Sequence, residues 1–174
     1  ENVERTLGQA RLFGALYFEK DSSWFGHDTA MTLEPKIQYL YTSYEDQTAI
    51  GLYDSTPLLT DVEGLFRGQE FTGLDRISDN NQVTRCITSR ILDKNNREQF
   101  VLSLGQIFYL EDNKVIAATK NQDRSALAAE MDWRFNKNWY AHSDIQVTTD
   151  TDKVDLSSVG LEYRQDAKRF IQLS

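Results

Sequence analysis

Cysteine and proline are scarce in this chain, and long apolar runs are absent. Cys86 is the only cysteine, so no disulfide can form within the chain, and cysteine usage does not indicate a compartment. No apolar run reaches about 18 residues, which leaves no candidate for a membrane-spanning helix. Basic residues are outnumbered, and the formal net charge is -8. Since a nucleic-acid-binding domain carries a basic face, we expect no nucleic-acid partner.

The low mean hydropathy, -0.56, would usually indicate a soluble protein. It does not exclude a transmembrane β-barrel, because only alternate residues of each barrel strand face lipid while the others face a polar interior. Residues 1–5 lack an initiator methionine and the apolar segment of a signal peptide, and residues 169–174 lie within an alternating segment. We therefore expect residues 1–174 to be part of one transmembrane β-barrel domain, incomplete at both ends.

Strand-like alternation recurs along the whole chain, whereas no convincing amphipathic helix is found. In residues 126–135, for example, apolar side chains occupy every second position and charged side chains fill most of the others. Most segments run about ten residues, which suits a tilted membrane strand better than a globular one. The sequence predicts an all-β antiparallel up-and-down meander of eight long strands, at 7–19, 29–43, 82–92, 99–110, 126–135, 139–148, 156–165 and from 169 onward.

The links between these strands alternate in length. A shorter set lies at 20–28, 93–98, 136–138 and 166–168, and a longer set at 44–81, 111–125 and 149–155. Outer-membrane barrels have short periplasmic turns and long extracellular loops, so we expect 44–81 to be a long extracellular loop. Aromatic residues near both sets of strand ends fit the two aromatic girdles of such barrels.

The meander is compatible with more than one architecture. We favour an open, curved segment of a large outer-membrane β-barrel. A self-contained eight-stranded barrel, porin-like or adhesive, is possible because eight strands can close. A soluble β-sandwich binding module is also possible, and it would require the apolar face to meet a second sheet.

Three stretches stand out by their order and spacing. The first, 33–41, contains Leu-Glu-Pro followed by Gln-Tyr-Leu-Tyr; the second runs through 53–55 and 64–67 to 73–77; the third joins 81–84 and 88–90 to 103–107. Together they resemble the lipopolysaccharide-assembly protein family, also called organic solvent tolerance proteins. The main signature residues are Leu33, Glu34, Pro35, Gly64, Leu65, Phe66, Arg67, Gly73, Leu74, Asp75, Arg76, Ile77, Asn81, Gln82, Val83 and Thr84.

The resemblance implies a very large barrel in the outer membrane of a Gram-negative bacterium, plugged by the lipoprotein LptE. Such a barrel receives lipopolysaccharide from periplasmic bridge proteins through an amino-terminal domain and delivers it to the outer leaflet, without catalysing a reaction. The family's lateral opening lies between its first and last strands, so this piece is expected to be wall and loop. The family's disulfides use cysteines elsewhere, and no such role is implied for Cys86.

Asp132, His142 and Asp144 invite a metal-site or catalytic interpretation. A three-residue turn at 136–138 would place Asp132 opposite His142, and Glu130 opposite Asp144. A zinc site would need a second histidine or a cysteine, and His27 lies in another link. Since no Gly-x-Ser-x-Gly, Gly-rich phosphate loop or Cys-x-x-Cys occurs, we expect neither an enzyme nor a cofactor.

The pleat assigns two faces to the predicted sheet. We expect an exposed, convex, lipid-contacting face that includes Leu102, Leu104, Phe108, Leu127, Met131, Trp133, Val159, Leu161 and Tyr163. The concave, lumen-facing set comprises Glu34, Lys36, Gln38, Thr84, Cys86, Arg90, Glu130, Asp132, Arg134, His142, Asp144, Gln146, Glu162 and Arg164.

The long link 44–81 is acidic yet carries several large apolar residues. An entirely solvated loop would not need them, so we expect it to fold over or into the lumen and to touch the plug through Leu65, Phe66 and Phe71. The alternative is a surface loop packed only on neighbouring loops. A loop of this size should not bury these residues by itself, so we expect it to be poorly packed in this chain alone.

Overall fold

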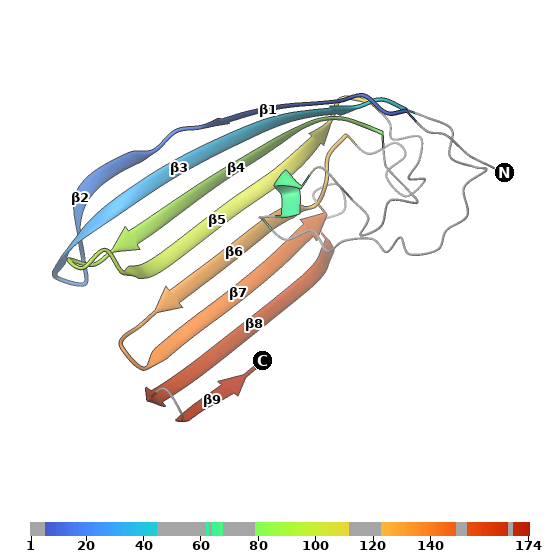
Figure 1. Cartoon of the computed structure of the whole chain (residues 1–174). Helices are drawn as coiled ribbons and strands as arrows, with labels where there is room; N and C mark the ends of the chain where they lie inside the picture. Colours follow the sequence, from blue (N-terminus) through green and yellow to red (C-terminus); the bar gives the residue numbers. More distant parts are fainter. Residues whose placement is uncertain are drawn as a thin grey trace.

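The computed structural model describes residues 6–44, 62, 64–67, 79–111, 123–148, 153–166 and 169–174. These residues form one antiparallel sheet of nine strands and one short 3-10 turn (Figure 1). None of their helical segments is long and apolar enough to span a membrane. The elements are β1 (Gln9–Ala15), β2 (Phe18–Trp24), β3 (His27–Thr42), η1 (Gly64–Phe66), β4 (Asn80–Leu92), β5 (Glu98–Tyr109), β6 (Leu127–Arg134), β7 (Trp139–Thr148), β8 (Lys153–Asp166) and β9 (Arg169–Leu173).

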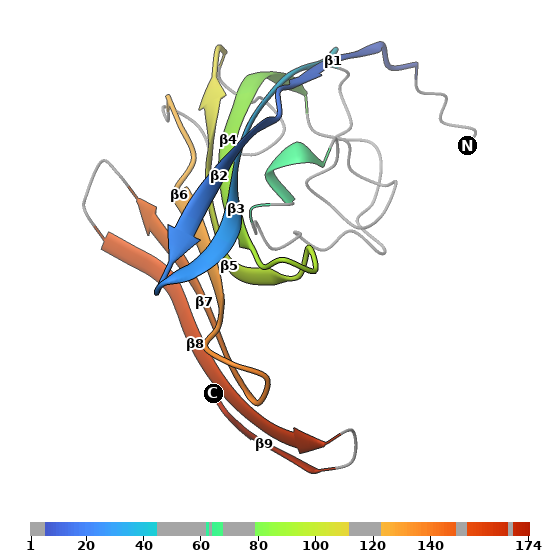
Figure 2. The same ribbon diagram turned by 90° about the vertical axis from the view of Figure 1, so that its left-hand side faces the viewer.

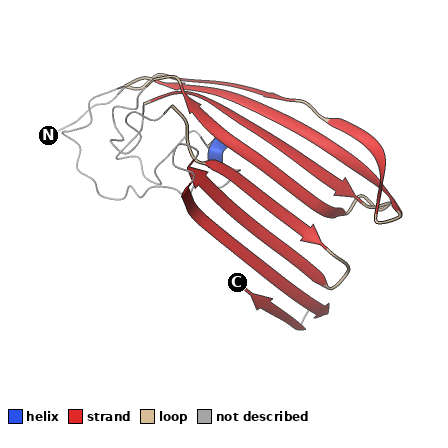
Figure 3. Ribbon diagram, turned by 180° about the vertical axis from the view of Figure 1, so that it is seen from behind, coloured by secondary structure: helices blue, strands red, loops and turns tan. Residues whose placement is uncertain are grey.

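From β3 to β9 each strand pairs with the next one in sequence, as the view from behind shows (Figure 3). The predicted all-β antiparallel meander is therefore confirmed. In the part of the chain that the structure describes, the strands at the two edges do not pair with each other, so the sheet stays open. This overturns the closed eight-stranded ring.

One predicted strand, 7–19, is divided into β1 and β2, which pair with the two halves of the same edge of β3. The register is unbroken across the division, because Ala15 pairs with Lys36 and Phe18 pairs with Leu33. At the break, the Leu16 N–H donates to the Pro35 carbonyl at 3.0 Å. In an antiparallel pair of this kind each residue normally donates its N–H to the other's carbonyl. Pro35 has no N–H to donate to Leu16, so the ladder of hydrogen bonds is interrupted at that point.

The turns on one side of the sheet are tight. Phe25 and Gly26 form a two-residue link between Trp24 and His27, with φ angles of 49° and 77°. Positive φ at both positions is what a type I′ hairpin turn requires. The prediction of a nine-residue link at 20–28 was wrong, because β2 continues five residues past its expected end at Glu19. The predicted three-residue turn at 136–138 is confirmed, since the Phe135 N–H donates to the Trp139 carbonyl at 3.2 Å.

The opposite side carries the links 43–79, 110–126 and 149–152. The last is shorter than predicted because β8 begins at Lys153 rather than at residue 156. The β7–β8 register shifts between Gln146 and Val147, which accommodates one extra residue in β8. Such a bulge breaks the two-residue period, so the alternation could not reveal the first residues of this strand.

The sheet is strongly curved. Figure 2 shows β3, β4 and β5 bending around η1, which lies on the concave side. The register assigns all nine apolar residues predicted for the convex face to one face, and none of the nine is buried. No second layer of described residues covers that face, which argues against the sandwich alternative.

Candidate functional site on the concave face

The concave face carries most of the polar side chains of the sheet. Cross-strand pairs connect Gln38 to Thr84, Lys36 to Cys86, and Asp132 to His142. By the same register, the concave face holds all the residues predicted to face the lumen: Glu34, Lys36, Gln38, Thr84, Cys86, Arg90, Glu130, Asp132, Arg134, His142, Asp144, Gln146, Glu162 and Arg164.

Part of the long link 44–81, Val62 together with Gly64–Arg67, packs on this face and is called the docked segment. Leu65 is fully buried, with 0% of its surface exposed, and Val62 is 4% exposed. They pack against Cys86, Ile107 and Ala128, which come from β4, β5 and β6. The expectation that the link would be poorly packed in this chain alone was wrong for these two residues. The sheet, the wall on which the link packs, supplies an apolar socket formed by Cys86, Ile107 and Ala128.

Hydrogen bonds from the wall reach the main chain of the docked segment. The Thr84 hydroxyl donates to the Leu65 carbonyl at 3.1 Å. Arg11 Nη2 and Gln38 Nε2 both donate to the Phe66 carbonyl, at 2.9 Å and 3.3 Å. The Val62 N–H donates to Glu130 Oε1 at 2.8 Å. Four strands, β1, β3, β4 and β6, therefore hold the segment in place.

Gly105 forms the floor of the socket. A Cβ atom added at this position would lie 2.5 Å from Leu65 Cδ1, which is closer than non-bonded carbons approach. Only glycine therefore lets β5 come this close to the docked leucine. Gly105, Ile107 and Ala128 were not predicted as functional residues. A glycine in the interior of a strand was the signal that could have pointed to a close approach.

The remaining signature residues lie in several places. Leu33 and Pro35 lie on the convex face of β3, and Asn81 and Val83 on the convex face of β4. Glu34, Gln82 and Thr84 are on the concave face, while Gly64–Arg67 belong to the docked segment. The structure therefore brings Leu65, Phe66, Gln82 and Thr84 to one side of the sheet. Phe71, Gly73, Leu74, Asp75, Arg76 and Ile77 lie outside the described residues.

A polar chain crosses β6, β7 and β8 on the concave face. His142 Nδ1 lies 2.7 Å from Asp132 Oδ1, and its Nε2 lies 3.2 Å from Asp144 Oδ1. Tyr140 donates to Asp132, and Ser158 donates to Asp144. The predicted pairings of Asp132 with His142 and of Glu130 with Asp144 are confirmed. Within the described ranges, no three histidine, cysteine or carboxylate side chains are arranged to hold a metal ion.

A second network spans β3, β4 and β5. The Arg90 guanidinium forms an ion pair with Glu34 and lies 2.9 Å from Glu98 Oε1. Thr88 and Ser103 share a hydrogen bond at 3.0 Å beside it. Each charge has an opposite neighbour, which stabilises the wall without creating a group poised for chemistry.

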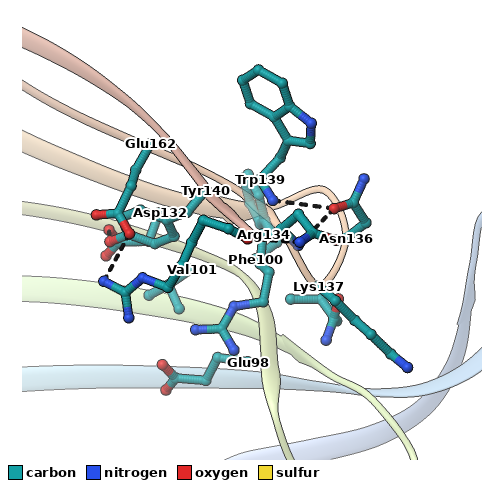
Figure 4. Close-up of a pocket in the computed structure, with 13 residues that line it drawn as sticks. Glu98, Phe100, Val101, Asp132, Arg134, Asn136, Lys137, Trp139, Tyr140 and Glu162 are labelled. Atoms are coloured by element: carbon teal, nitrogen blue, oxygen red, sulfur yellow. Dashed lines mark hydrogen bonds and ion pairs between the residues drawn. The ribbon is translucent and has the colours of Figure 1, made fainter. Parts of the chain in front are cut away.

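Close to the tight turns, a hollow on the concave face is lined by charges of both signs (Figure 4). Glu98, Asp132 and Glu162 contribute carboxylates, while Arg134 and Lys137 contribute cations. Arg164, which also lines the hollow, forms an ion pair with Glu162 at 2.8 Å. The mixture gives the hollow no preference for a ligand of one charge sign.

The β4–β5 turn offers a test of pH dependence. Asp93 Oδ1 accepts the backbone N–H groups of Arg97 at 3.0 Å and Asn95 at 2.7 Å. These bonds, that of Arg97 foremost, hold the pKa of the Asp93 carboxyl below its usual value. A lowered pKa means that the carboxylate stabilises the turn at pH values above its unfolded pKa, and that this stabilisation is lost as the pH falls through the folded pKa.

We therefore expect hydrogen exchange of the Asn95 and Arg97 amides, corrected for the intrinsic rate at each pH, to accelerate on acidification below about pH 4. Asp93→Asn keeps an acceptor oxygen but does not titrate, so this acceleration should disappear. Asp93→Ala should give fast exchange at every pH. An unchanged acid response in the asparagine variant would contradict the assignment.

A family model described as "LptD: LPS transport system D" matches residues 1–174. The chain belongs to the LptD family. It is 67% identical over 173 residues to the LPS-assembly protein LptD of Pseudoalteromonas atlantica, covering 99% of this chain and 23% of that relative. It is 46% identical over 178 residues to LptD of Shewanella oneidensis, covering 100% of this chain and again 23% of the relative.

This chain therefore spans about a quarter of the length of the LptD relatives that it matches. A third relative, LptD of Pseudoalteromonas translucida, gives the same proportion, with 42% identity over 178 residues that make up 24% of its length. The match extends over the docked segment and over all nine strands, since it includes the whole of this chain.

Proposed function

We propose that this chain is a section of the barrel wall of the outer-membrane protein that assembles lipopolysaccharide in the outer leaflet. The observation that carries the proposal is the contrast between the two faces of one open sheet. Convex residues such as Ile37, Leu104 and Val159 are apolar and exposed, whereas the concave face is polar and charged. Lipid outside and water inside would satisfy both faces.

The strand lengths and links support a transmembrane orientation. The strands β4, β5 and β7 contain 13, 12 and 10 residues, enough to cross a bilayer at the tilt of barrel strands. In this orientation the tight turns lie in the periplasm and the link 44–81 is extracellular. Residues 1–174 then form part of one barrel domain, an internal piece of its carboxy-terminal barrel.

The partners in this proposal follow from family membership. Lipopolysaccharide is the transported molecule, outer-membrane lipid contacts the convex face, and the lipoprotein LptE fills the lumen. Periplasmic bridge proteins deliver lipopolysaccharide through parts of the whole protein that this chain does not include. Because Leu65 is buried in the wall and Phe66 is only partly covered, Phe66 is the better candidate for contact with the plug. The chain catalyses no reaction in this proposal, and its polar networks brace the wall.

The two faces can be tested by lipid quenching in the full-length protein with its lipoprotein partner, reconstituted in phosphatidylcholine bilayers. Single cysteines replace Leu104 or Val159 on the convex face and Gln146 or Glu162 on the concave face, in a Cys86→Ser background, and carry a fluorophore. Brominated acyl chains should quench the first pair strongly and the second pair weakly. A water-soluble quencher should show the reverse. Equal quenching at all four positions would contradict the proposal.

A further inference from the structure

Arg85 lies on the convex face of β4, among apolar neighbours. One charged side chain, that of Arg85, lies on the convex face of the three strands β3, β4 and β5. The convex positions run from Met31 to Tyr41, from Asn81 to Ile91 and from Phe100 to Phe108. The convex positions that the structure describes in β6, β7 and β8 carry none. Other described charges, such as Lys20 opposite Met31 and Arg124 opposite Phe108, register on this face outside the strands β3–β8. Arg85 calls for an explanation because it lies within the strands, among convex positions that are otherwise uncharged.

The guanidinium of Arg85 is held toward one end of the strand. Its central carbon lies 5.0 Å from the centre of the Phe108 ring. Phe108 pairs with Val83, two residues nearer than Arg85 to the start of β4. The side chain therefore leans toward the side of the sheet with the long links, where the Tyr39 hydroxyl donates to Asn81 Oδ1 at 3.1 Å. Polar groups thus continue above it on the same face.

No carboxylate among the described residues forms an ion pair with Arg85, unlike Arg90 and Arg164 on the concave face. Its direct cross-strand neighbours are Ile37 and Gln106. The Gln106 amide nitrogen donates to the Ser125 carbonyl at 2.9 Å. The convex face therefore presents a cation that no described carboxylate neutralises.

The depth of Arg85 makes an interfacial anion accessible to it. Arg85 is five residues from Asn80, which places its Cα about 13 Å below the start of the strand at the usual rise and tilt. An arginine side chain that extends toward the surface covers about half of that depth. Without an anion or the interface, an arginine on the lipid face costs about 2–4 kcal/mol near the midplane. A lipid phosphate of the outer leaflet removes this cost.

We infer that Arg85 binds the phosphate of a lipid in the outer leaflet, with Phe108 holding the guanidinium and contacting the lipid's acyl chain. The inference rests on the proposed function, since it requires the convex face to contact lipid. A guanidinium presents two parallel N–H donors to phosphate oxygens, and the geometry is lost with an ammonium group. The ligand class is an anionic lipid that carries a phosphate monoester, in contrast to the zwitterionic phosphodiester of phosphatidylcholine, and Arg85 is a binding residue on the outside of the wall.

The test uses the full-length protein with its lipoprotein partner in phosphatidylcholine bilayers. A fluorophore on Ile37→Cys, in a Cys86→Ser background, reports on lipid beside Arg85, because Ile37 is its cross-strand neighbour. The probe is phosphatidic acid with brominated acyl chains, compared with equally brominated phosphatidylcholine. We expect about fivefold preference for phosphatidic acid at this position. The preference should vanish in Arg85→Gln and fall in Arg85→Lys.

Two controls separate the explanations. A fluorophore on Val159→Cys should show no preference, and Arg97→Gln, in the tight turn at the other end of β4, should leave the preference at Ile37 unchanged. If the Ile37 label showed the same preference for phosphatidic acid with Arg85 and with Arg85→Gln, the inference would be overturned. So would loss of the preference on adding millimolar inorganic phosphate, which would indicate a site for free phosphate. Absence of quenching by either lipid at both labels would instead contradict the proposed wall, and with it the inference.

Discussion

Replacing Gly105 with alanine should force Leu65 out of its socket and release the docked segment from the wall. The added Cβ would lie 2.5 Å from Leu65 Cδ1, so the fully buried Leu65 side chain would have to shift from its present position. Overpacking of this kind typically costs about 1–3 kcal/mol. Since about 1.4 kcal/mol corresponds to a factor of ten, hydrogen exchange of the Val62 amide, which donates to Glu130, should accelerate by roughly 5- to 150-fold. Gly105→Val should have a larger effect.

Gly160→Ala is the matched control for this substitution. Gly160 is also a strand glycine on the concave face, but a Cβ there would meet only the Leu173 and His142 carbonyls, at 3.9 Å and 4.0 Å. Exchange at Val62 should not change in this variant. Leu65→Ala, which leaves a cavity instead of a clash, should also release the segment, at a cost of about 2–5 kcal/mol. Normal protection in both Gly105→Ala and Leu65→Ala would mean that the socket does not hold the loop.

Arginine substitutions should separate the two faces by their folding free energy. Leu104 lies near the middle of β5 on the convex face, so Leu104→Arg should destabilise the full-length protein in lipid by about 2–4 kcal/mol. Gln146 lies on the concave face among polar neighbours, so Gln146→Arg should be nearly neutral. Denaturant titration of folding into lipid vesicles measures both. Equal losses at the two positions would contradict the assignment of the convex face to lipid.

The strands were largely predictable because alternation is a local signal. Where the structure differs, a backbone effect explains the difference. Pro35 divides the edge strand because it lacks an N–H, and a bulge beside Gln146 hides the start of β8 from a two-residue period. The extension of β2 to Trp24 was missed because Glu19–Ser23 is mostly polar, as suits a strand at the sheet edge.

The docked segment was harder to predict. Its apolar residues indicated that the long link should not remain solvated, but not which surface covers them. Leu65 meets Ile107 and Ala128, more than 40 and 60 residues away in sequence, and local patterns carry no information about such contacts. Gly105 was the available clue, because a glycine inside a strand indicates that something approaches the backbone closely. The sequence does not show that the approaching group is Leu65. The convex Arg85 breaks the apolar pattern, and sequence alternation alone does not show that Phe108 orients it.

The anchoring of the docked segment also affects how its sequence can change. All four hydrogen bonds described between the wall and residues 62–66 end on main-chain atoms, at Val62 N, Leu65 O and Phe66 O. Main-chain atoms are the same for every residue type except at the nitrogen of proline. The wall therefore selects among side chains here mainly at Val62 and Leu65, which fill the socket, and at Phe66, whose ring meets Phe13 edge to face with centroids 6.0 Å apart. A loop fastened mainly through its main chain tolerates substitutions that a loop held by side-chain hydrogen bonds would not.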